Sequence, residues 1–183
     1  MSASSRPVAA EVALRPMVEA DVGAVLDIDR QVHPDPWSHD FLVGQLAAID
    51  RLHHVVADRN GDIVGHAALT VVVDEGHVAT VSVRPDEQGV GIGGRLLADL
   101  CRFAVEQGLA ALTLEVRSSN RRAIDLYRRF GFAPAGVRPA YFAGVQNGAP
   151  EDALVMWVHD IAEPAFLGRV EAAEHAPQEK ARA

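Results

Sequence analysis

In Val81-Ser82-Val83-Arg84-Pro85-Asp86-Glu87-Gln88-Gly89-Val90-Gly91-Ile92-Gly93-Gly94-Arg95-Leu96-Leu97, the sequence predicts a strand, then a glycine loop, then a helix. Pro85 ends the alternation typical of a strand, and from Gly91 onward the apolar spacing becomes helical. A glycine-rich turn at a helix N-terminus presents free N–H groups and the positive end of the helix dipole, so it can bind an anion, most often phosphate. The other interpretation is that the glycines only tighten a turn.

The same glycines fit a second phosphate-binding pattern, which the surrounding sequence argues against. Gly89-x-Gly91-x-x-Gly94 satisfies the dinucleotide fingerprint, and Glu115 lies near the position of a ribose-binding acid. However, residues 84 to 88 separate the strand from the first glycine, and too little chain follows Glu115 to complete a doubly wound sheet. No Gly-Lys-Ser/Thr is present, which excludes a nucleotide P-loop.

Composition sets the outer limits on fold and partners. With 183 residues, of which 49% are hydrophobic, the chain can build one well-packed domain. Its formal charge of −8 disfavours nucleic acid as a direct partner and suits a basic peptide or a cationic amine. A single cysteine excludes an internal disulfide framework and a cysteine-based metal site. Without a membrane-spanning run or a signal peptide, we expect a cytoplasmic protein, monomeric or weakly dimeric, that binds no membrane.

Periodicity and turn signals predict alternating layers of helices and strands. Strands are expected at 12–16, 52–57, 63–73, 77–83, 112–116, within 132–142 and at 153–158, and helices at 19–32, 38–48, from Gly91 to about 107 and after Asn120. Asn60-Gly61 is a strong hairpin signal, so the second to fourth strands should form an antiparallel meander. We expect a flexible arm at 1–10, a domain at 11–160 and a disordered or loosely helical tail at 161–183. This order predicts an α/β protein.

Several motifs together resemble those of one enzyme family, the GNAT acetyltransferases. Gln88-x-x-Gly91-x-Gly93 is similar to the family's acyl-CoA pyrophosphate loop. The stretches Leu114-Glu115-Val116-Arg117-Ser118-Ser119-Asn120, Ala123-Ile124-Asp125-Leu126-Tyr127 and Phe130-Gly131-Phe132, with Pro36-Trp37-Ser38, Arg138, Tyr141-Phe142 and Glu151-Asp152-Ala153, resemble the RimI-type ribosomal-protein-alanine N-acetyltransferases of that family. The likeness covers about residues 12 to 158. It implies the GNAT fold, a mixed, mostly antiparallel sheet of six to seven strands flanked by about four helices.

The resemblance implies that Glu115 is the general base and Tyr127 the general acid. Acetyl transfer needs a neutral amine, and an α-amine with a pKa near 8 is about a tenth neutral at pH 7, so a carboxylate acting directly or through water is sufficient. The leaving thiolate, with a pKa near 8.5, can take a proton from a nearby tyrosine. The alternatives are that Glu115 is a solvated strand-edge carboxylate and that Tyr127 is a core aromatic residue.

The resemblance also implies a binding site for acetyl-CoA as cosubstrate, with no metal. The residues involved are Val81, Ser82, Val83, Gly89, Val90, Gly91, Ile92, Gly93, Gly94 and Asn120. The strand would offer backbone groups to the pantetheine arm and the thioester carbonyl, or it is plain core strand; Asn120 would cap a helix and also hydrogen-bond coenzyme A.

The cysteine, the histidines and three residues of the expected peptide groove are the remaining candidates for chemistry or binding. Cys101 is read as a small buried apolar residue rather than a nucleophile. The histidines, His53-His54 included, show no metal-ligand spacing. Trp37, Arg138 and Tyr141 occupy positions that line the peptide groove in the family, although an aromatic residue at a helix start is as often core packing.

Two departures from the family pattern bear on binding. Gly89-Val90 stands where related enzymes usually have Arg-Gln, and Gly94 adds another glycine, so pyrophosphate binding should rest on backbone N–H groups and the helix dipole rather than on an arginine. The loop from Gly144 to Pro150, which borders the acceptor groove in the family, is slightly longer than usual. Peptide selectivity is therefore less firmly predicted than acetyl-CoA use.

These expectations combine into a hypothesis about function. The chain should transfer acetyl from acetyl-CoA to the N-terminal α-amine of a protein, foremost the N-terminal alanine of a small-subunit ribosomal protein, whose basic N-terminal peptide suits the acidic chain. One alternative keeps the mechanism and changes the acceptor to lysine, a small amine or several protein N-termini. Another is an acetyl-CoA-binding regulatory module without useful turnover.

Overall fold

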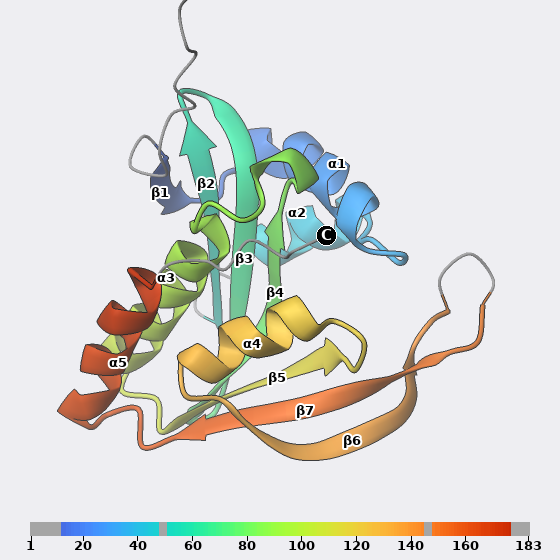
Figure 1. Cartoon of the computed structure of the whole chain (residues 1–183). Helices are drawn as coiled ribbons and strands as arrows, with labels where there is room; N and C mark the ends of the chain where they lie inside the picture. The colour runs from blue at the N-terminus through green and yellow to red at the C-terminus, as the bar shows by residue number, and fades with distance from the viewer. Residues whose placement is uncertain (1–11, 48–50, 145–147, 177–183) are drawn as a thin grey trace, which may run out of the picture.

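The computed structural model describes residues 12–47, 51–144 and 148–176, which form one seven-stranded sheet covered by helices on both faces (Figure 1). The strands are β1 (Ala13–Pro16), β2 (Leu52–Arg59), β3 (Asp62–Val72), β4 (Glu75–Val83), β5 (Ala111–Arg117), β6 (Ala133–Phe142) and β7 (Glu151–His159). The α-helices are α1 (Val22–Val32), α2 (His39–Leu46), α3 (Ile92–Glu106), α4 (Arg121–Arg129) and α5 (Pro164–Glu174). The order of elements from β1 to β7 and the α/β class are those expected from the sequence.

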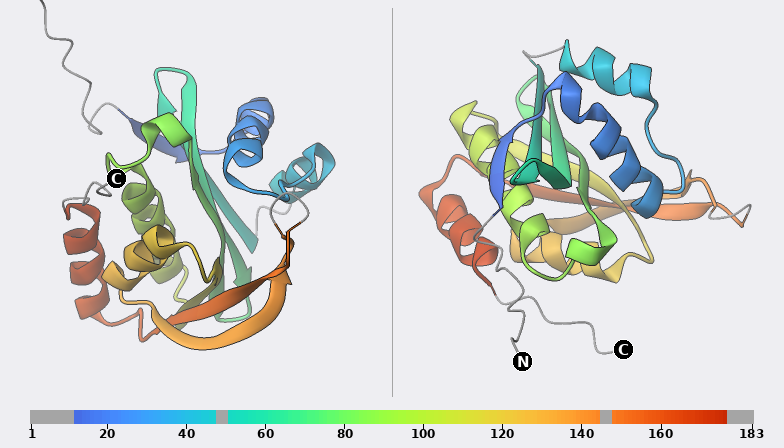
Figure 2. Two further views of the ribbon diagram at one scale, coloured as in Figure 1. Left: turned by 45° about the vertical axis from the view of Figure 1, so that its right-hand side comes forward. Right: turned by 90° about the horizontal axis from the view of Figure 1, so that it is seen from above.

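Side chains on the two faces of the sheet enter two separate hydrophobic cores. The strand order is β1-β2-β3-β4-β5-β7-β6, and α1 and α2 cover one face while α3, α4 and α5 cover the other (Figure 2). Because successive strand residues point to opposite faces, Val56 packs with α1 and α2 whereas Val55 and Ala57 pack on the α3 side.

Local signals in the sequence explain the meander and the helix ends. Asn60 and Gly61 have φ of 55° and 91°, as a tight hairpin turn between β2 and β3 requires, and β2, β3 and β4 pair antiparallel as predicted. The side chains of Ser38 and Asn120 accept hydrogen bonds from the first turns of α2 and α4. Gly108, with φ of 70°, follows the end of α3.

The parallel pair β4 and β5 is the irregular place in the sheet. The two strands pair only from Glu75 opposite Ala111 to His77 opposite Thr113. Beyond this point β5 pairs with β7 and β4 with β3, so the two strands diverge (Figure 1). Their separation leaves one edge of β4, up to Val83, without a strand partner in the described structure. Of the predicted site residues, Val81 on β4 and Glu115 on β5 lie beside this opening.

The C-terminal segment differs from the expected disordered or loosely helical tail. Residues Pro164–Glu174 form α5, in which Phe166, Val170 and Ala173 are buried against the core. These positions are i, i+4 and i+7 and form a narrow stripe, which was too short to stand out among the polar residues around it. This helix is the fifth, where the sequence predicted about four. Residues 1–11 and 177–183, the predicted arm and end of the tail, lie outside the described residues.

No helix in the described ranges has the length and apolar character needed to cross a bilayer.

The packing of α5 predicts that it contributes to stability. Replacing Phe166, which is 4% exposed, by alanine should lower the free energy of unfolding by about 3 kcal/mol, because the large ring leaves a cavity against the core. Denaturant unfolding measures this. Leu167→Ala, at a position 40% exposed on the same helix, should change it by less than about 0.5 kcal/mol. Equal effects of the two substitutions would contradict the packing of α5.

Candidate active site

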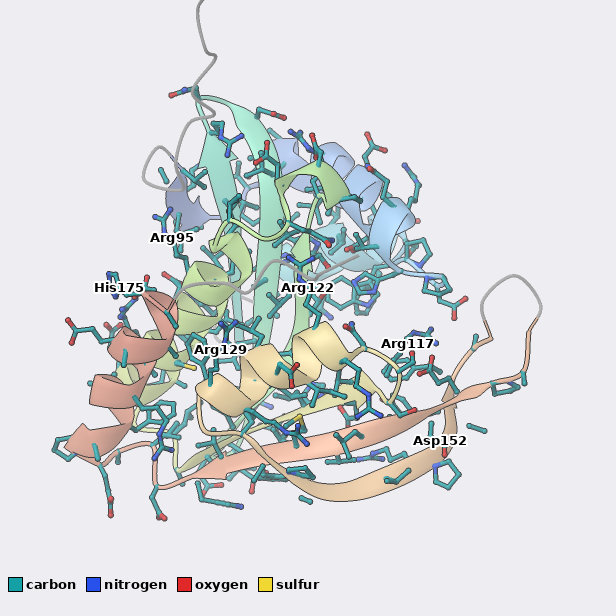
Figure 3. The ribbon with its side chains drawn as sticks, in the orientation of Figure 1. Arg95, Arg117, Arg122, Arg129, Asp152 and His175 are labelled. Carbon is teal, nitrogen blue, oxygen red and sulfur yellow. The ribbon has the colours of Figure 1, made fainter. Side chains whose placement is uncertain are left out.

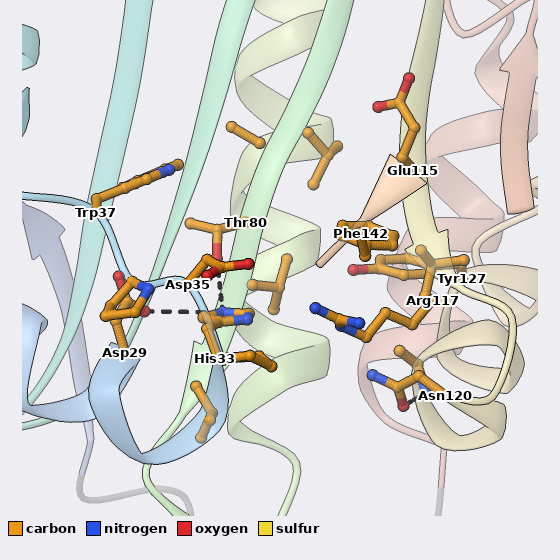
Figure 4. A pocket seen from close by; sticks show the side chains of 18 residues that line it. Asp29, His33, Asp35, Trp37, Thr80, Glu115, Arg117, Asn120, Tyr127 and Phe142 are labelled. Carbon is orange, nitrogen blue, oxygen red and sulfur yellow. Dashed lines mark hydrogen bonds and ion pairs between the residues drawn. The ribbon is translucent and has the colours of Figure 1, made fainter. Parts of the chain in front are cut away.

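Two adjoining hollows occupy the opening between β4 and β5. The first, of about 250 Å³, lies between the loop from α1 to α2 on one side and β5 and α4 on the other (Figure 4). The second, of about 150 Å³, lies between the glycine loop and α4. Val81, Asn120 and Ala123 line both hollows, so they are continuous. A ligand lying along β4 could therefore occupy both.

Glu115 projects from β5 into the first hollow with both carboxylate oxygens engaged. His77 on β4 places its Nε2 atom 2.6 Å from Oε2, and Arg138 on β6 places its Nε atom 3.2 Å from Oε1. The Glu115 side chain is 10% exposed, whereas that of Arg138 is 58% exposed. A largely buried carboxylate needs such hydrogen-bond or charge partners. Arg138 is the partner that an incoming cation can replace more easily, because it is exposed. Glu115 is therefore not the solvated edge residue considered above.

Tyr127 projects from α4 into the same hollow. Its ring packs against Phe132 with centroids 5.8 Å apart, and its hydroxyl points toward the wall formed by His33 and Asp35 (Figure 4). The hydroxyl makes no hydrogen bond to any other described residue. Burial raises the pKa of Tyr127 to about 12, so the hydroxyl keeps its proton at neutral pH and is free to donate it.

A chain of polar residues forms the opposite wall and continues into the protein. His33, at the end of α1, places Nε2 2.8 Å from Ser82 Oγ and 3.8 Å from Asp29 Oδ1. Asp29 Oδ1 lies 2.8 Å from His66 Nε2, and His66 Nδ1 lies 3.1 Å from His54 Nε2. Among the described residues, all the buried polar side chains except that of Asp21 belong to this chain.

Burial and hydrogen bonds shift the pKa values along this chain. An ionised Asp29 accepts a hydrogen bond from Nε2–H of His66, whose other ring nitrogen faces His54. Burial lowers the pKa of His54 to about 3, and burial also lowers the pKa of His33. The pKa of Asp29 is lowered as well: burial opposes this, but the hydrogen bond and the charge interaction with His66, with smaller contributions from His33 and Ser82, outweigh it. The wall is thus one buried carboxylate backed by imidazoles.

The predicted coenzyme-binding residues fall into two groups in the structure. Val81, Val83, Gly89, Ile92 and Gly93 line the second hollow, as Asn120 does. Gly89 and Gly91 have φ of 83° and 95°, a conformation that disfavours other residues, and Gly91 is the N-cap of α3. The first N–H groups of α3 have no partner within the helix and lie at this end of the hollow.

The remaining predicted residues lie elsewhere in the same region. Gly94 is buried within α3, and Val90 is exposed at the loop surface. The Ser82 side chain turns away from the coenzyme side to His33, so only its backbone could serve a ligand in the second hollow.

The predicted acceptor-groove residues are brought only partly together. Trp37 lines the first hollow and packs edge-on against His54, with centroids 6.4 Å apart. Arg138 contacts Glu115, and Tyr141 lies under the Arg138 guanidinium at 5.6 Å but is 51% exposed. Phe142, next to Tyr141, is the aromatic residue of β6 that lines the hollow, held by Arg117 at 4.6 Å.

Sequence reasoning did not single out His77 or the residues of the polar wall. The sequence spacing of the histidines was considered only for metal ligation, which does not reveal contacts made between separate elements. His54 and His66 meet because β2 and β3 pair, and Asp29 meets them from α1. The available signal was polar residues within otherwise apolar runs. Cys101 is fully buried, and burial raises the pKa of its thiol, in agreement with the apolar interpretation.

Comparisons with known proteins agree with this arrangement. The profile of the acetyltransferase (GNAT) family matches residues 22–132. The [ribosomal protein bS18]-alanine N-acetyltransferase of Escherichia coli (strain K12) is 34% identical over 136 residues, which are 74% of this chain and 89% of that protein. The crystal structure of the ribosomal-protein-S18-alanine N-acetyltransferase from Escherichia coli aligns with a TM-score of 0.74 at 31% identity, over 81% of this chain and 94% of that one. A ribosomal-protein-alanine N-acetyltransferase from Brucella melitensis aligns with a TM-score of 0.71 at 25% identity, over 80% and 99% of the two chains.

The buried imidazole of His54 predicts loss of stability in mild acid. With a pKa of about 3 in the folded chain and about 6.5 unfolded, His54 takes up a proton on unfolding at any pH between these values. The contribution of the neutral His54 ring to the free energy of unfolding is fully present above pH 6.5. It falls by about 2 kcal/mol by pH 5. His54→Gln keeps an N–H donor for His66 and should flatten this part of the stability curve, measured by denaturant unfolding at each pH.

The matched control for this experiment is His39→Gln, at an exposed histidine on α2. The control should keep the pH dependence of the unaltered chain. An equally steep loss of stability in the His54→Gln variant would contradict the assignment.

Proposed function

The chain belongs to the GNAT family of acetyltransferases, and on that premise we propose that it transfers the acetyl group of acetyl-CoA to the N-terminal α-amine of a protein. The foremost substrate is the N-terminal alanine of a small-subunit ribosomal protein in the cytoplasm, by analogy with the relatives named above. The observation that carries the proposal is that Glu115 and Tyr127 line one hollow, directly beside the free edge of β4.

The divided hollow suggests how the two substrates meet. The glycine loop and the start of α3 would hold the phosphates of the coenzyme, and the edge of β4 near Val81 would hold the acyl arm through backbone groups. The acceptor would enter from the side of Trp37 and Phe142, which brings its amine into the first hollow. Direct transfer needs no covalent enzyme intermediate, in keeping with a buried and inert Cys101.

Glu115 would bind the acceptor and take its proton. Its Oε1 atom is held by Arg138, which is exposed enough for the neutral α-amine of the acceptor to replace it. His77 would keep the other oxygen in place during the exchange. As the amine nitrogen forms its bond to the acetyl carbon, the proton passes to Glu115 directly or through water.

Tyr127 would serve the leaving group. As the carbon–sulfur bond breaks, its hydroxyl donates a hydrogen bond to the sulfur that gains negative charge. A tyrosine of pKa about 12 is about 3.5 units less acidic than a thiol of pKa near 8.5, so complete proton transfer is uphill. The hydroxyl therefore keeps its proton and stabilises the developing thiolate through a hydrogen bond, and the thiolate takes up a proton from water as the coenzyme leaves.

Charge supports a basic acceptor. Asp35 stands exposed in the loop that lines the first hollow and forms no ion pair with a described residue. It adds to an overall charge of −8 that attracts cationic peptides. Lysine, a small amine or several protein N-termini remain the competing acceptors, and a regulatory module without turnover is the competing class.

The first experiment is a mass-spectrometric acetylation assay with acetyl-CoA and an alanine-initiated basic ribosomal peptide. We expect one acetyl group on the free α-amine and none on the same peptide with its α-amine blocked. Acetylation of the blocked peptide would redirect the proposal to lysine. Binding of acetyl-CoA without product across a panel of peptides would favour the regulatory module.

Substitutions test the two residue roles in the same assay. Tyr127→Phe removes only the hydroxyl and should lower kcat by at least about 100-fold, and Glu115→Gln should slow the reaction by a similar order. Circular dichroism and acetyl-CoA binding control for the fold. Full activity of the Tyr127→Phe variant would contradict the catalytic role and support the alternative that Tyr127 is a core aromatic residue.

The high pKa of Tyr127 predicts the shape of the pH profile. The rate should rise as the acceptor α-amine loses its proton near pH 8 and then stay level to about pH 10, because Tyr127 remains protonated up to about pH 12. Initial rates from pH 6 to 10 measure this. A descending limb between pH 8 and 10 that disappears in the Tyr127→Phe variant would contradict the raised pKa.

A further inference from the structure

The glycine loop lacks the arginine that the family pattern places within it, and the structure brings a guanidinium to the loop from another element. Arg122 lies in the first turn of α4, and its Nη1 atom donates to Oε1 of Gln88 over 3.0 Å. A Cβ atom built on Gly89 would lie 3.4 Å from Nη2 of Arg122. The guanidinium is thus in contact with the loop, although residue 122 is far from it in sequence.

The partner of Arg122 leaves its charge available. Gln88 is a neutral amide whose Nε2 atom donates to the backbone oxygen of Val83, so the amide is fixed with its oxygen toward Arg122. Among the described residues Arg122 forms no ion pair with a carboxylate, unlike Arg117 and Arg128 of neighbouring segments. A guanidinium has five donors, and one hydrogen bond to an amide leaves most of them free for an anion.

The same face of α4 lines the second hollow over two helical turns. Arg122, Leu126 and Arg129 are spaced at i, i+4 and i+7 and all line it, together with Gly89 and Gly93. Figure 3 shows Arg122 and Arg129 on α4. The Nε atom of Arg129 is buried without a hydrogen-bond partner in the described residues. In a chain of charge −8, two cations facing a glycine loop and a helix N-terminus indicate a site for a multiply charged anion.

We propose that Arg122 supplies the cation missing from the loop and clamps the pyrophosphate of coenzyme A from the α4 side, with the N–H groups of the loop and of α3 on the other. This inference rests on the proposed use of acetyl-CoA. It replaces the expectation that backbone groups bind the pyrophosphate without an arginine. Since guanidinium and phosphate groups match in geometry, Arg122 would turn from Gln88 toward two phosphate oxygens.

The competing explanation is that Arg122 and Gln88 only connect α4 to the loop. If this is so, removing the guanidinium would lower folding stability and leave ligand affinity unchanged. If Arg122 contacts phosphate, removing the guanidinium would lower affinity and make it less dependent on salt, because one attraction that salt screens is lost.

Isothermal titration calorimetry of the full chain with CoA and with dephospho-CoA separates these explanations. Arg122→Ala should weaken binding of both ligands about tenfold and reduce the dependence of affinity on salt. Arg122→Lys keeps the charge without the planar fork and should fall in between. Arg121→Ala is the matched control, because Arg121 is an exposed neighbour on the same turn and does not line the second hollow. It should change affinity less than twofold.

Each other outcome overturns the assignment at a different point. Loss of affinity for CoA alone, with dephospho-CoA unaffected, would place Arg122 at the 3′-phosphate instead of the pyrophosphate. Unchanged affinity of the Arg122→Ala variant for both ligands, with or without a lower Tm, would show that Arg122 only connects α4 to the loop. Those results would leave the proposed function intact. Absence of CoA and acetyl-CoA binding by the unaltered chain would instead remove the proposed function and this inference with it.

Discussion

The divergence of β4 from β5 is the constraint on which the rest of the structure depends. Only three residue pairs join the strands, after which each pairs with its other neighbour alone. A sheet interior with an unpaired edge would normally be unfavourable, since backbone polar groups need partners. Here the edge borders both hollows, so the groups left unpaired by the fold are those a substrate could satisfy. Glu115 on β5 and Val81 on β4 both line this opening.

The walls of the opening differ in their electrostatics. Around the first hollow, hydrogen bonds with His66 and Ser82 compensate one buried carboxylate, that of Asp29, and His77 and Arg138 hold Glu115. Around the second hollow, Arg122 and Arg129 stand beside a helix N-terminus. The anionic wall suits an ammonium group and the cationic wall suits phosphates. Charge thus distinguishes the two adjoining hollows.

Signals confined to a few neighbouring residues predicted their structures well. Asn60-Gly61 predicted a hairpin, Ser38 and Asn120 predicted helix caps, and the glycine loop predicted the start of α3; all four are confirmed. The prediction was wrong for α5, because three buried residues spread over two turns give a weak periodic signal. Its burial depends on a complementary surface of α3, which no local pattern reveals.

The sequence by itself determined the order of elements, the α/β class and the family resemblance, because these follow from spacing and turn chemistry along the chain. Motifs within one segment also proposed Glu115 and Tyr127 as catalytic residues, a prediction that the experiments above would test. Only the tertiary structure decided which side chains surround them. The contacts between His77 and Glu115, between Asp29 and His66, and between Arg122 and the glycine loop each join separate elements. Such contacts depend on strand register and helix placement, so they have no signature in the sequence.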